Sequence, residues 1–133
     1  MVITEIINAV KSGQLDEKLT ALYGADALAS QKVRYEEVLS KAKDLLGDEE
    51  AHIFSAPGRT EVGGNHTDHQ LGRVVAASID LDVIAVVVPT DDSIVTYHAK
   101  GFSVSPVDLH NLEINEAEKN TTESLIRGIA AGF

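Results

Sequence analysis

Twelve residues, Gly58 to His69, constrain this chain more than any other segment. They read Gly-Arg-Thr-Glu-Val-Gly-Gly-Asn-His-Thr-Asp-His, and strand-like apolar segments lie on both sides. Because glycine has no Cβ and tolerates positive φ, a loop with three glycines can bring its backbone close to a ligand. Its polar side chains can then converge on a molecule rich in hydroxyl or phosphate groups. We therefore expect a binding loop between two strands.

The side chains of this loop suit a phosphorylated or polyhydroxylated ligand. Arg59 carries a rigid fork of donors that stays charged near neutral pH, so it can balance a phosphate or keep a nearby carboxylate ionised. Asn65 donates and accepts, and Asp68 accepts when ionised, so the two together can bind the hydroxyls of a polyol. The residue types leave one alternative open, a solvated hairpin loop whose polar groups bond only to the local backbone.

Three potential metal ligands occur within four residues, at His66, Asp68 and His69. Transition-metal sites usually take ligands from more than one element and orient them with further hydrogen bonds. The spacing His-Glu-x-x-His is absent from the sequence. We expect no metal site here, and we expect the remaining histidines to be ordinary strand and turn residues: His52, His98 and His110.

Charge and composition exclude several classes of partner. The chain of 133 residues has 21 acidic and 11 basic side chains and a formal net charge of -10, so it repels polyanions such as nucleic acids and anionic membranes. It has no cysteine, hence no disulfide or thiolate metal site. Residues 1–10 contain Glu5 and no basic residue, unlike a signal peptide, and the apolar run 83–88 is too short to span a bilayer. We expect a cytoplasmic protein.

Residues 1–50 are predicted to form a helical N-terminal extension. Three helical stripes end at or near glycines, with Gly24 closing the second and Gly47 the third, and Asp26 is the expected N-cap of the third. This extension either packs on the main sheet or forms a partner-binding module. The stripes are Ile3, Ile6, Ile7 and Val10; Leu15, Leu19 and Leu22; and Tyr35, Val38, Leu39, Ala42, Leu45 and Leu46.

Residues 51–133 are predicted to form a sheet followed by a helix. A short strand at 53–56 is expected to break at Pro57-Gly58, and a long strand covers 74–88. Within the long strand, Ile79, Leu81 and Val83 alternate with Asp80 and Asp82, as in a half-exposed strand. Short strands at 94–97 and 102–104 follow, and then a helix that begins with a capping box at Asn120-x-x-Glu123. This order indicates an α+β fold with antiparallel hairpins.

The central segment resembles a known signature. Residues 55–69, Ser-Ala-Pro-Gly-Arg-Thr-Glu-Val-Gly-Gly-Asn-His-Thr-Asp-His, are similar to the galactokinase pattern A-P-G-R-x-N-L-I-G-E-H-x-D-Y. Residues 72–80 look like that family's next strand, and residues 123–129 resemble its helix with an R-G-x pattern. The resemblance covers about residues 50–133 and points to the GHMP small-molecule kinases. It implies a mixed sheet with a packed helix, as in the N-terminal half of such a kinase.

The resemblance also implies roles for individual residues. Arg59 matches the arginine near the transferred phosphoryl group, and Asn65, His66, Thr67 and Asp68 match the sugar-binding segment. The implied activity is an ATP- and Mg²⁺-dependent transfer of a phosphoryl group to the anomeric hydroxyl of galactose or a related sugar. The implied partners are therefore a small sugar and ATP.

Three positions depart from the family pattern. Glu61 replaces its asparagine, Asn65 its glutamate and His69 its tyrosine. The first two substitutions keep a second hypothesis open, a non-catalytic relative that binds or senses a sugar. A third hypothesis is an interaction protein built on the helical extension.

The family's Gly-Ser-Ser-Ser-type phosphate loop has no counterpart in these 133 residues. We therefore expect residues 51–133 to be the first part of a kinase N-terminal domain, truncated at Phe133, and the fragment alone to be inactive. The apolar stripe Leu125, Ile126 and Ile129 is expected to make the fragment self-associate.

Overall fold

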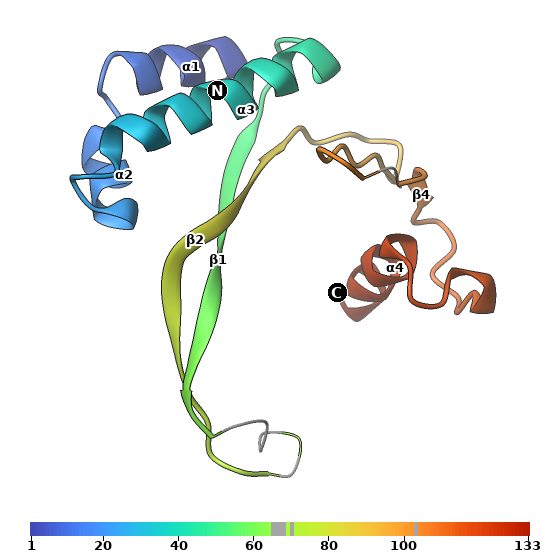
Figure 1. The fold of residues 1–133 in the computed structure, drawn as a ribbon. Coiled ribbons are helices and arrows are strands. Elements are labelled where there is room, and N and C mark those ends of the chain that lie inside the picture. The colour runs from blue at the N-terminus through green and yellow to red at the C-terminus, as the bar shows by residue number, and fades with distance from the viewer. Residues whose placement is uncertain (65–68, 70, 103) are drawn as a thin grey trace. The chain divides into compact units, whose positions relative to one another are not determined.

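A computed structural model describes residues 1–64, 69, 71–102 and 104–133 (Figure 1). The chain forms two compact units, Met1–Pro89 and Thr90–Phe133. The helical extension and the first hairpin lie in the same unit. The domain boundary at residue 50 that the sequence suggests stays a prediction.

Three helices open the first unit. They are α1 (Ile3–Lys11), α2 (Asp16–Tyr23) and α3 (Leu28–Leu46). The predicted stripes are confirmed in part, because Leu22, Leu45 and Leu46 are exposed while the other stripe residues are buried or half-buried. Gly24 and Gly47 end α2 and α3 with φ of 83° and 86°, a conformation that glycine adopts without strain. The expected cap of α3 is wrong, because Ala27 holds the N-cap position and makes no side-chain cap bond.

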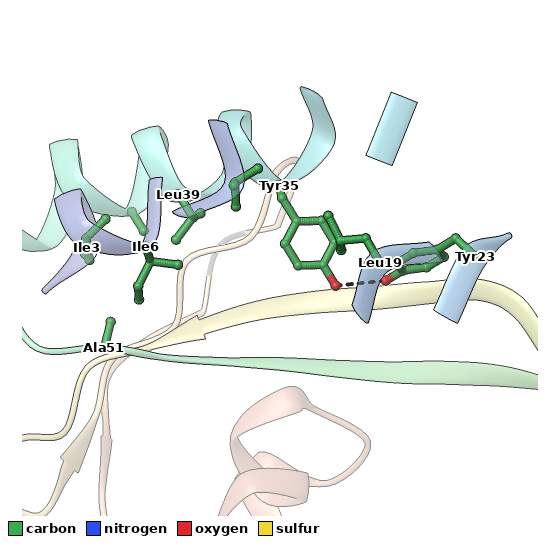
Figure 2. Close-up of a cluster of buried hydrophobic side chains, with 9 residues drawn as sticks. Ile3, Ile6, Leu19, Tyr23, Tyr35, Leu39 and Ala51 are labelled. Atoms are coloured by element: carbon green, nitrogen blue, oxygen red, sulfur yellow. Dashed lines mark hydrogen bonds between the residues drawn. The ribbon is translucent and has the colours of Figure 1, made fainter. Parts of the chain in front are cut away.

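The core of this unit lies between the helices and the start of the hairpin (Figure 2). Ile3, Val10 and Leu39 have no exposed surface, so α1 and α3 are in close apolar contact. Ala51, which directly precedes the first strand, is buried in the same cluster. The other members of the cluster are Ile6, Leu19, Tyr23, Tyr35 and Ala42.

The loop after α3 fastens the start of α1. The backbone N–H and the hydroxyl of Thr4 donate to the carboxylate of Asp48 at 2.7 and 2.8 Å. These bonds satisfy a free N–H at the helix start and hold the pKa of Asp48 below its usual value. The N–H of Ala51 donates to the carbonyl of Met1 at 3.0 Å. The hairpin therefore begins at a point that is tied to both α1 and α3.

A long antiparallel hairpin completes the unit, with β1 (His52–Gly63) paired to β2 (Val75–Val87). The predicted break at Pro57-Gly58 is wrong, because β1 continues through both residues. A register shift between Pro57 and Arg59 accommodates the proline, which is tolerated at bulges and on edge strands. A Cβ on Gly58 would lie 3.1 Å from the Ile79 side chain, so the strands approach closely at this shift.

The second unit contains a small antiparallel sheet, β3 (Ile94–Val95) with β4 (Val107–Asp108), the short helix η2 (Glu116–Glu118) and α4 (Thr122–Gly132). The predicted strand 94–97 is therefore shorter than expected. Its expected partner at 102–104 is reduced to a bridge between Phe102 and Ala99 among the described residues.

The helix α4 forms as predicted, but its cap differs. Thr121 is the N-cap, and its hydroxyl accepts from the N–H of Ser124 at 3.3 Å, whereas Asn120 has a φ of 65°. The carboxylate of Glu123 accepts from the backbone of Ser105 at 3.2 Å and does not close a capping box.

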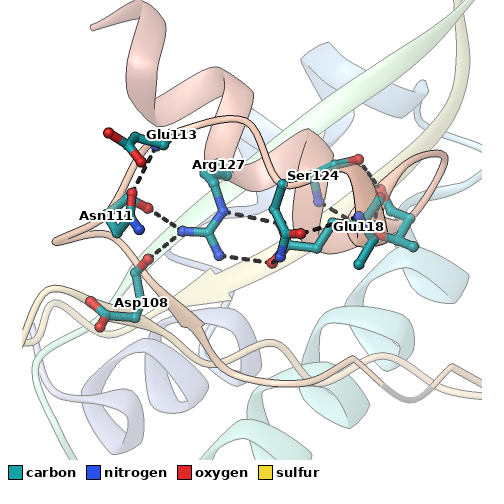
Figure 3. Close-up of polar contacts among 9 residues, drawn as sticks. Asp108, Asn111, Glu113, Glu118, Ser124 and Arg127 are labelled. Atoms are coloured by element: carbon teal, nitrogen blue, oxygen red, sulfur yellow. Dashed lines mark hydrogen bonds and ion pairs between the residues drawn. The ribbon is translucent and has the colours of Figure 1, made fainter.

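Arg127 holds this second unit together (Figure 3). Its Nε and Nη2 donate to the two carboxylate oxygens of Glu118 at 3.0 and 3.1 Å, and Nη1 donates to the carbonyls of Asp108 and Asn111. The forked guanidinium thus joins α4 to η2 and to the end of β4.

The α+β class, with helices followed by a sheet and a final helix, is confirmed. The described strands pair antiparallel, in two sheets of two strands. In the part of the chain that the structure describes, no helix is long and apolar enough to cross a membrane.

Candidate functional site

The first half of the predicted binding loop is wrong, because residues 58–63 continue β1 and most of them pair with β2. The segment from Gly64 to Val74 connects the far ends of the two strands. Of the five predicted site residues, Arg59 belongs to the described part of the chain. The predicted sugar-binding residues Asn65, His66, Thr67 and Asp68 lie outside it. The described part of the site consists of the two strands that carry the loop.

Arg59 lies on β1 immediately after the first register shift and pairs with Ser78 of β2. It is exposed. A second register shift follows between Glu61 and Gly63. Bulges bend and twist a strand and change the direction of its side chains, so the two shifts decide where the segment with Arg59 points.

Gly64 begins the loop in a conformation that needs glycine. Its φ is 117°, and a Cβ there would lie 2.7 Å from the carbonyl oxygen of Arg73 and 2.7 Å from the Cα of Val74. Real Cβ atoms do not approach backbone so closely, so the two ends of the loop meet at a point where only glycine fits. Gly63, one residue earlier, would have no atom within 4 Å of an added Cβ.

The hairpin faces differ from the alternation that the sequence suggests. Leu81 and Val83 are 72% and 68% exposed, whereas the side chain of Asp82 is only 1% exposed. The interpretation of Asp82 as a residue of the solvent face is therefore wrong. Ile84 and Val86, which share its side of β2, pack against the helical core, as does Val88 directly after the strand.

Four side chains, Tyr23, Arg34, Ser55 and Asp82, form what we call the Asp82 network. The Asp82 carboxylate accepts from the hydroxyl of Tyr23 at 2.5 Å, the hydroxyl of Ser55 at 2.5 Å and Nη1 of Arg34 at 2.6 Å. Nη2 of Arg34 donates to the Asp82 carbonyl at 2.8 Å. The hydroxyls of Tyr23 and Tyr35 share a bond of 2.9 Å, which Figure 2 shows. One carboxylate thus joins α2, α3 and both strands.

The surroundings of this network shift two pKa values. Burial alone would raise the pKa of Asp82, but the hydrogen bonds from Ser55, Tyr23 and Arg34, with the charge of Arg34, hold it below its usual value. Burial and the bond with Tyr23 raise the pKa of Tyr35. The carboxylate is therefore ionised and the phenol neutral at physiological pH.

Sequence reasoning missed the Asp82 network. The available signal was a second aspartate, two residues after Asp80, in an otherwise apolar strand that follows a glycine-rich loop.

Comparison with known proteins agrees with the resemblance that the loop segment carries. Residues 43–89, which include β1, the loop and β2, match the family model described as the galactokinase galactose-binding signature. A galactokinase of Streptococcus suis is 32% identical over 81 residues, which cover 59% of this chain and 21% of that protein. A galactokinase of Streptococcus thermophilus is 33% identical over 85 residues, with coverage of 62% and 22%.

A third galactokinase, from Lactobacillus helveticus, is 40% identical over 57 residues, which cover 43% of this chain and 15% of that protein. The chain thus spans about a fifth of the length of the first two curated relatives. No solved structure matches the chain. The resemblance that residues 55–69 carry is confirmed.

Replacement of Gly64 by alanine tests the close approach at the loop. We expect Gly64→Ala to lower the local free energy of opening at residues 75–78 by about 1–3 kcal/mol, the range for a strained backbone residue. Amide hydrogen exchange measures this value. Gly63→Ala is the matched control and should change it by less than about 0.5 kcal/mol. Equal effects of the two variants would show that the loop ends do not meet as described.

Proposed function

We propose that this chain, a relative of the galactokinases, forms the sugar-binding part of a kinase that phosphorylates the anomeric hydroxyl of galactose or a related sugar. The match of residues 43–89 to the galactose-binding signature is the observation that supports it most. Because the chain spans about a fifth of its relatives' length, the complete reaction is proposed for a kinase-length protein that contains it.

Arg59 has the proposed role of stabilising charge during transfer. Phosphoryl transfer depends on positioning and on neutralising the charge that spreads over the phosphoryl oxygens. Arg59 is exposed and lies on β1, where it and the next two residues pair with β2 in one register between the two shifts. A charged fork on a paired strand is better preorganised than one on a mobile loop, because less reorganisation accompanies the reaction.

Sugar binding is assigned to the loop residues Asn65, His66, Thr67 and Asp68. The Asp68 carboxylate can accept from two hydroxyls, and the Asn65 amide can both donate and accept. The structure supports this proposal through the frame of the loop, since β1, β2 and the tight contact at Gly64 hold its two ends together.

We propose ATP with Mg²⁺ as the phosphoryl donor. Within the described residues, no group of three or more histidine and carboxylate side chains is placed to hold a metal ion. The described residues therefore do not themselves fit a magnesium site, and no step proposed here for this chain passes through the ion. The contribution of the chain is to bind the sugar and to place one cation beside the transferred group.

A second candidate is a non-catalytic galactokinase relative that binds or senses a sugar. The substitutions at Glu61 and Asn65, where the family pattern has asparagine and glutamate, favour it. The two candidates differ in one measurement, because a sensor binds sugar with the loop intact but forms no sugar phosphate.

Arg59 is expected to affect turnover more than sugar affinity. In the kinase-length protein, Arg59→Ala should lower kcat about 100- to 1000-fold, the loss for one preorganised donor. The sugar Kd, measured by calorimetry, should stay within about twofold of the wild type because the residue acts on the phosphoryl group. Arg59→Lys keeps the positive charge but lacks the forked guanidinium, so its kcat should lie between those of the wild type and Arg59→Ala. An unchanged kcat with a weakened sugar Kd would assign Arg59 to sugar binding.

Asp68 is expected to be a sugar ligand. Hydrogen bonds to a charged group contribute about 1.5–3 kcal/mol, so Asp68→Ala should weaken sugar binding roughly 10- to 150-fold. Asp80→Ala removes an exposed carboxylate of β2 outside the loop and is the control, with no expected change in affinity. If calorimetry shows equal affinities for wild type and Asp68→Ala, the residue does not bind the sugar.

Asn65 is expected to alter the choice of sugar. The amide of Asn65 can donate a hydrogen bond, whereas the carboxylate in the family pattern can only accept one. A sugar that leaves a buried polar group of the site without a partner is bound poorly and is rejected. The wild type should prefer a different hexose or a substituted galactose, and Asn65→Glu should raise kcat/KM for galactose relative to that sugar. A panel of sugars with ATP and Mg²⁺ measures both ratios. A wild type that already prefers galactose, with no gain in Asn65→Glu, would make the replacement neutral.

A further inference from the structure

The β1–β2 hairpin changes register twice, and the larger change is the bulge between Pro57 and Arg59. Near the helices, His52 pairs with Val87 and Pro57 pairs with Asp82. Beyond the bulge, Arg59 pairs with Ser78. One residue of β1 therefore faces three of β2, namely Ile79, Asp80 and Leu81, so β2 carries two residues more than a regular ladder needs.

A regular hairpin without this bulge is an evident competitor. If β2 followed the outer register throughout, Pro57 would pair with Asp80 and Ala56 with Leu81. Because the strand period is two residues, such a slip keeps each side chain on the same face of the sheet. The slip changes the pairing of the inner part of the hairpin, where Ile84 and Val86 pack against the helical core. It would bring Ile84 to the place of Val86, so an apolar residue stays there and burial at that place distinguishes the two registers weakly.

The slip would exchange the two aspartates. Asp80, which is exposed, would move to the place that Asp82 now holds beside Tyr23, Arg34 and Ser55. Asp82 would move to the place of Ile84, which packs against the helical core. A carboxylate is costly at that apolar place, so Asp82 opposes the regular register as well as supporting the bulged one.

We propose that Asp82 is a positioning residue that selects the bulged register of β1 and β2 against the regular one. Its carboxylate, bonded to α2, α3 and β1, holds the core side of the bulge. A bulge bends the strand and increases its twist, so the arm with Arg59 and the loop takes its direction from this selection. The consequence for Arg59 in catalysis depends on the proposed function, whereas the selection of register does not.

Disulfide trapping reads the register directly, because the chain has no cysteine of its own. Ala56→Cys with Val83→Cys reports the bulged register, in which the two are paired. Ala56→Cys with Leu81→Cys reports the regular one. All three positions are exposed, and paired Cα atoms about 4.5–5.5 Å apart lie within disulfide range. The ratio of the two rates of oxidation under one redox buffer is the measurement.

The decisive variant is Asp82→Val, which removes the carboxylate and offers an apolar residue for the place of Ile84. We expect the wild type to oxidise the 56–83 pair faster, and Asp82→Val to change the ratio toward the 56–81 pair by at least about tenfold, since the bulged register then loses three hydrogen bonds to a charged group, each of which contributes at least about that factor. Asp80→Asn, the matched control, should keep the wild-type ratio. Adding Asp80→Asn to Asp82→Val should diminish the change, because no carboxylate then reaches Arg34.

Each other outcome contradicts the proposal. An unchanged ratio in Asp82→Val would show that the bulge does not depend on Asp82. A chain with Asp82→Val that has lost its far-ultraviolet helix signal would show that no folded competing register exists. If the variant with both Asp80→Asn and Asp82→Val changes the ratio of oxidation rates as much as Asp82→Val alone, Asp80 does not take the place of Asp82. None of these measurements requires kinase activity, so they remain informative if the proposed function fails.

Discussion

The carboxylate of Asp82 is the interaction on which the first unit depends. It is 1% exposed, and donors from α2, α3 and β1 surround it. An ion pair with a buried carboxylate often contributes little net stability, because desolvation offsets the attraction, but a buried carboxylate that loses its donors is costly. A buried carboxylate therefore favours folded arrangements that supply its hydrogen-bond donors over arrangements that do not. In this chain it connects a helical layer to a hairpin that apolar contacts hold only near its base.

The hairpin extends the influence of that contact to the loop. The apolar cluster ends near Ala51, the first residues of β1 and the last residues of β2, and the outer arm has exposed faces. Its direction follows from the bulge opposite Gly58, and its far end is closed by the contact between Gly64 and Arg73. Arg59 lies between these two points. The position of Arg59, the proposed cationic residue of the site, thus depends on the backbone geometry at the bulge and at Gly64.

Much of the fold was predictable because local rules decide it. The spacing of Ile3, Ile6 and Val10 predicts an amphipathic helix whatever the tertiary context, and Gly24 and Gly47 stop helices by their own backbone preference. The errors lie where distant partners decide. The sequence Pro57-Gly58 predicts a strand break, but in the structure a bulge accommodates the proline. The alternation predicts an exposed Asp82, because its partner Arg34 lies 48 residues away in the sequence.

The site was predictable to a different degree. Residue types and a family pattern predicted Arg59 and the sugar-binding segment as candidates. The match of residues 43–89 to the signature confirms the family resemblance. The roles of Asn65, His66, Thr67 and Asp68 stay predictions, since these residues lie outside the described part of the chain. Asp82 could not be assigned from the sequence, because a second aspartate in a strand does not reveal which helix will meet it.

The most direct test of the central claim is phosphorus NMR of a kinase-length protein that contains this chain, incubated with ATP, Mg²⁺ and a panel of hexoses. We expect a sugar phosphate whose phosphorus is coupled to an anomeric proton, which identifies transfer to the C1 hydroxyl. A product phosphorylated at C6, or ATP left intact with every hexose that the protein binds, would contradict it.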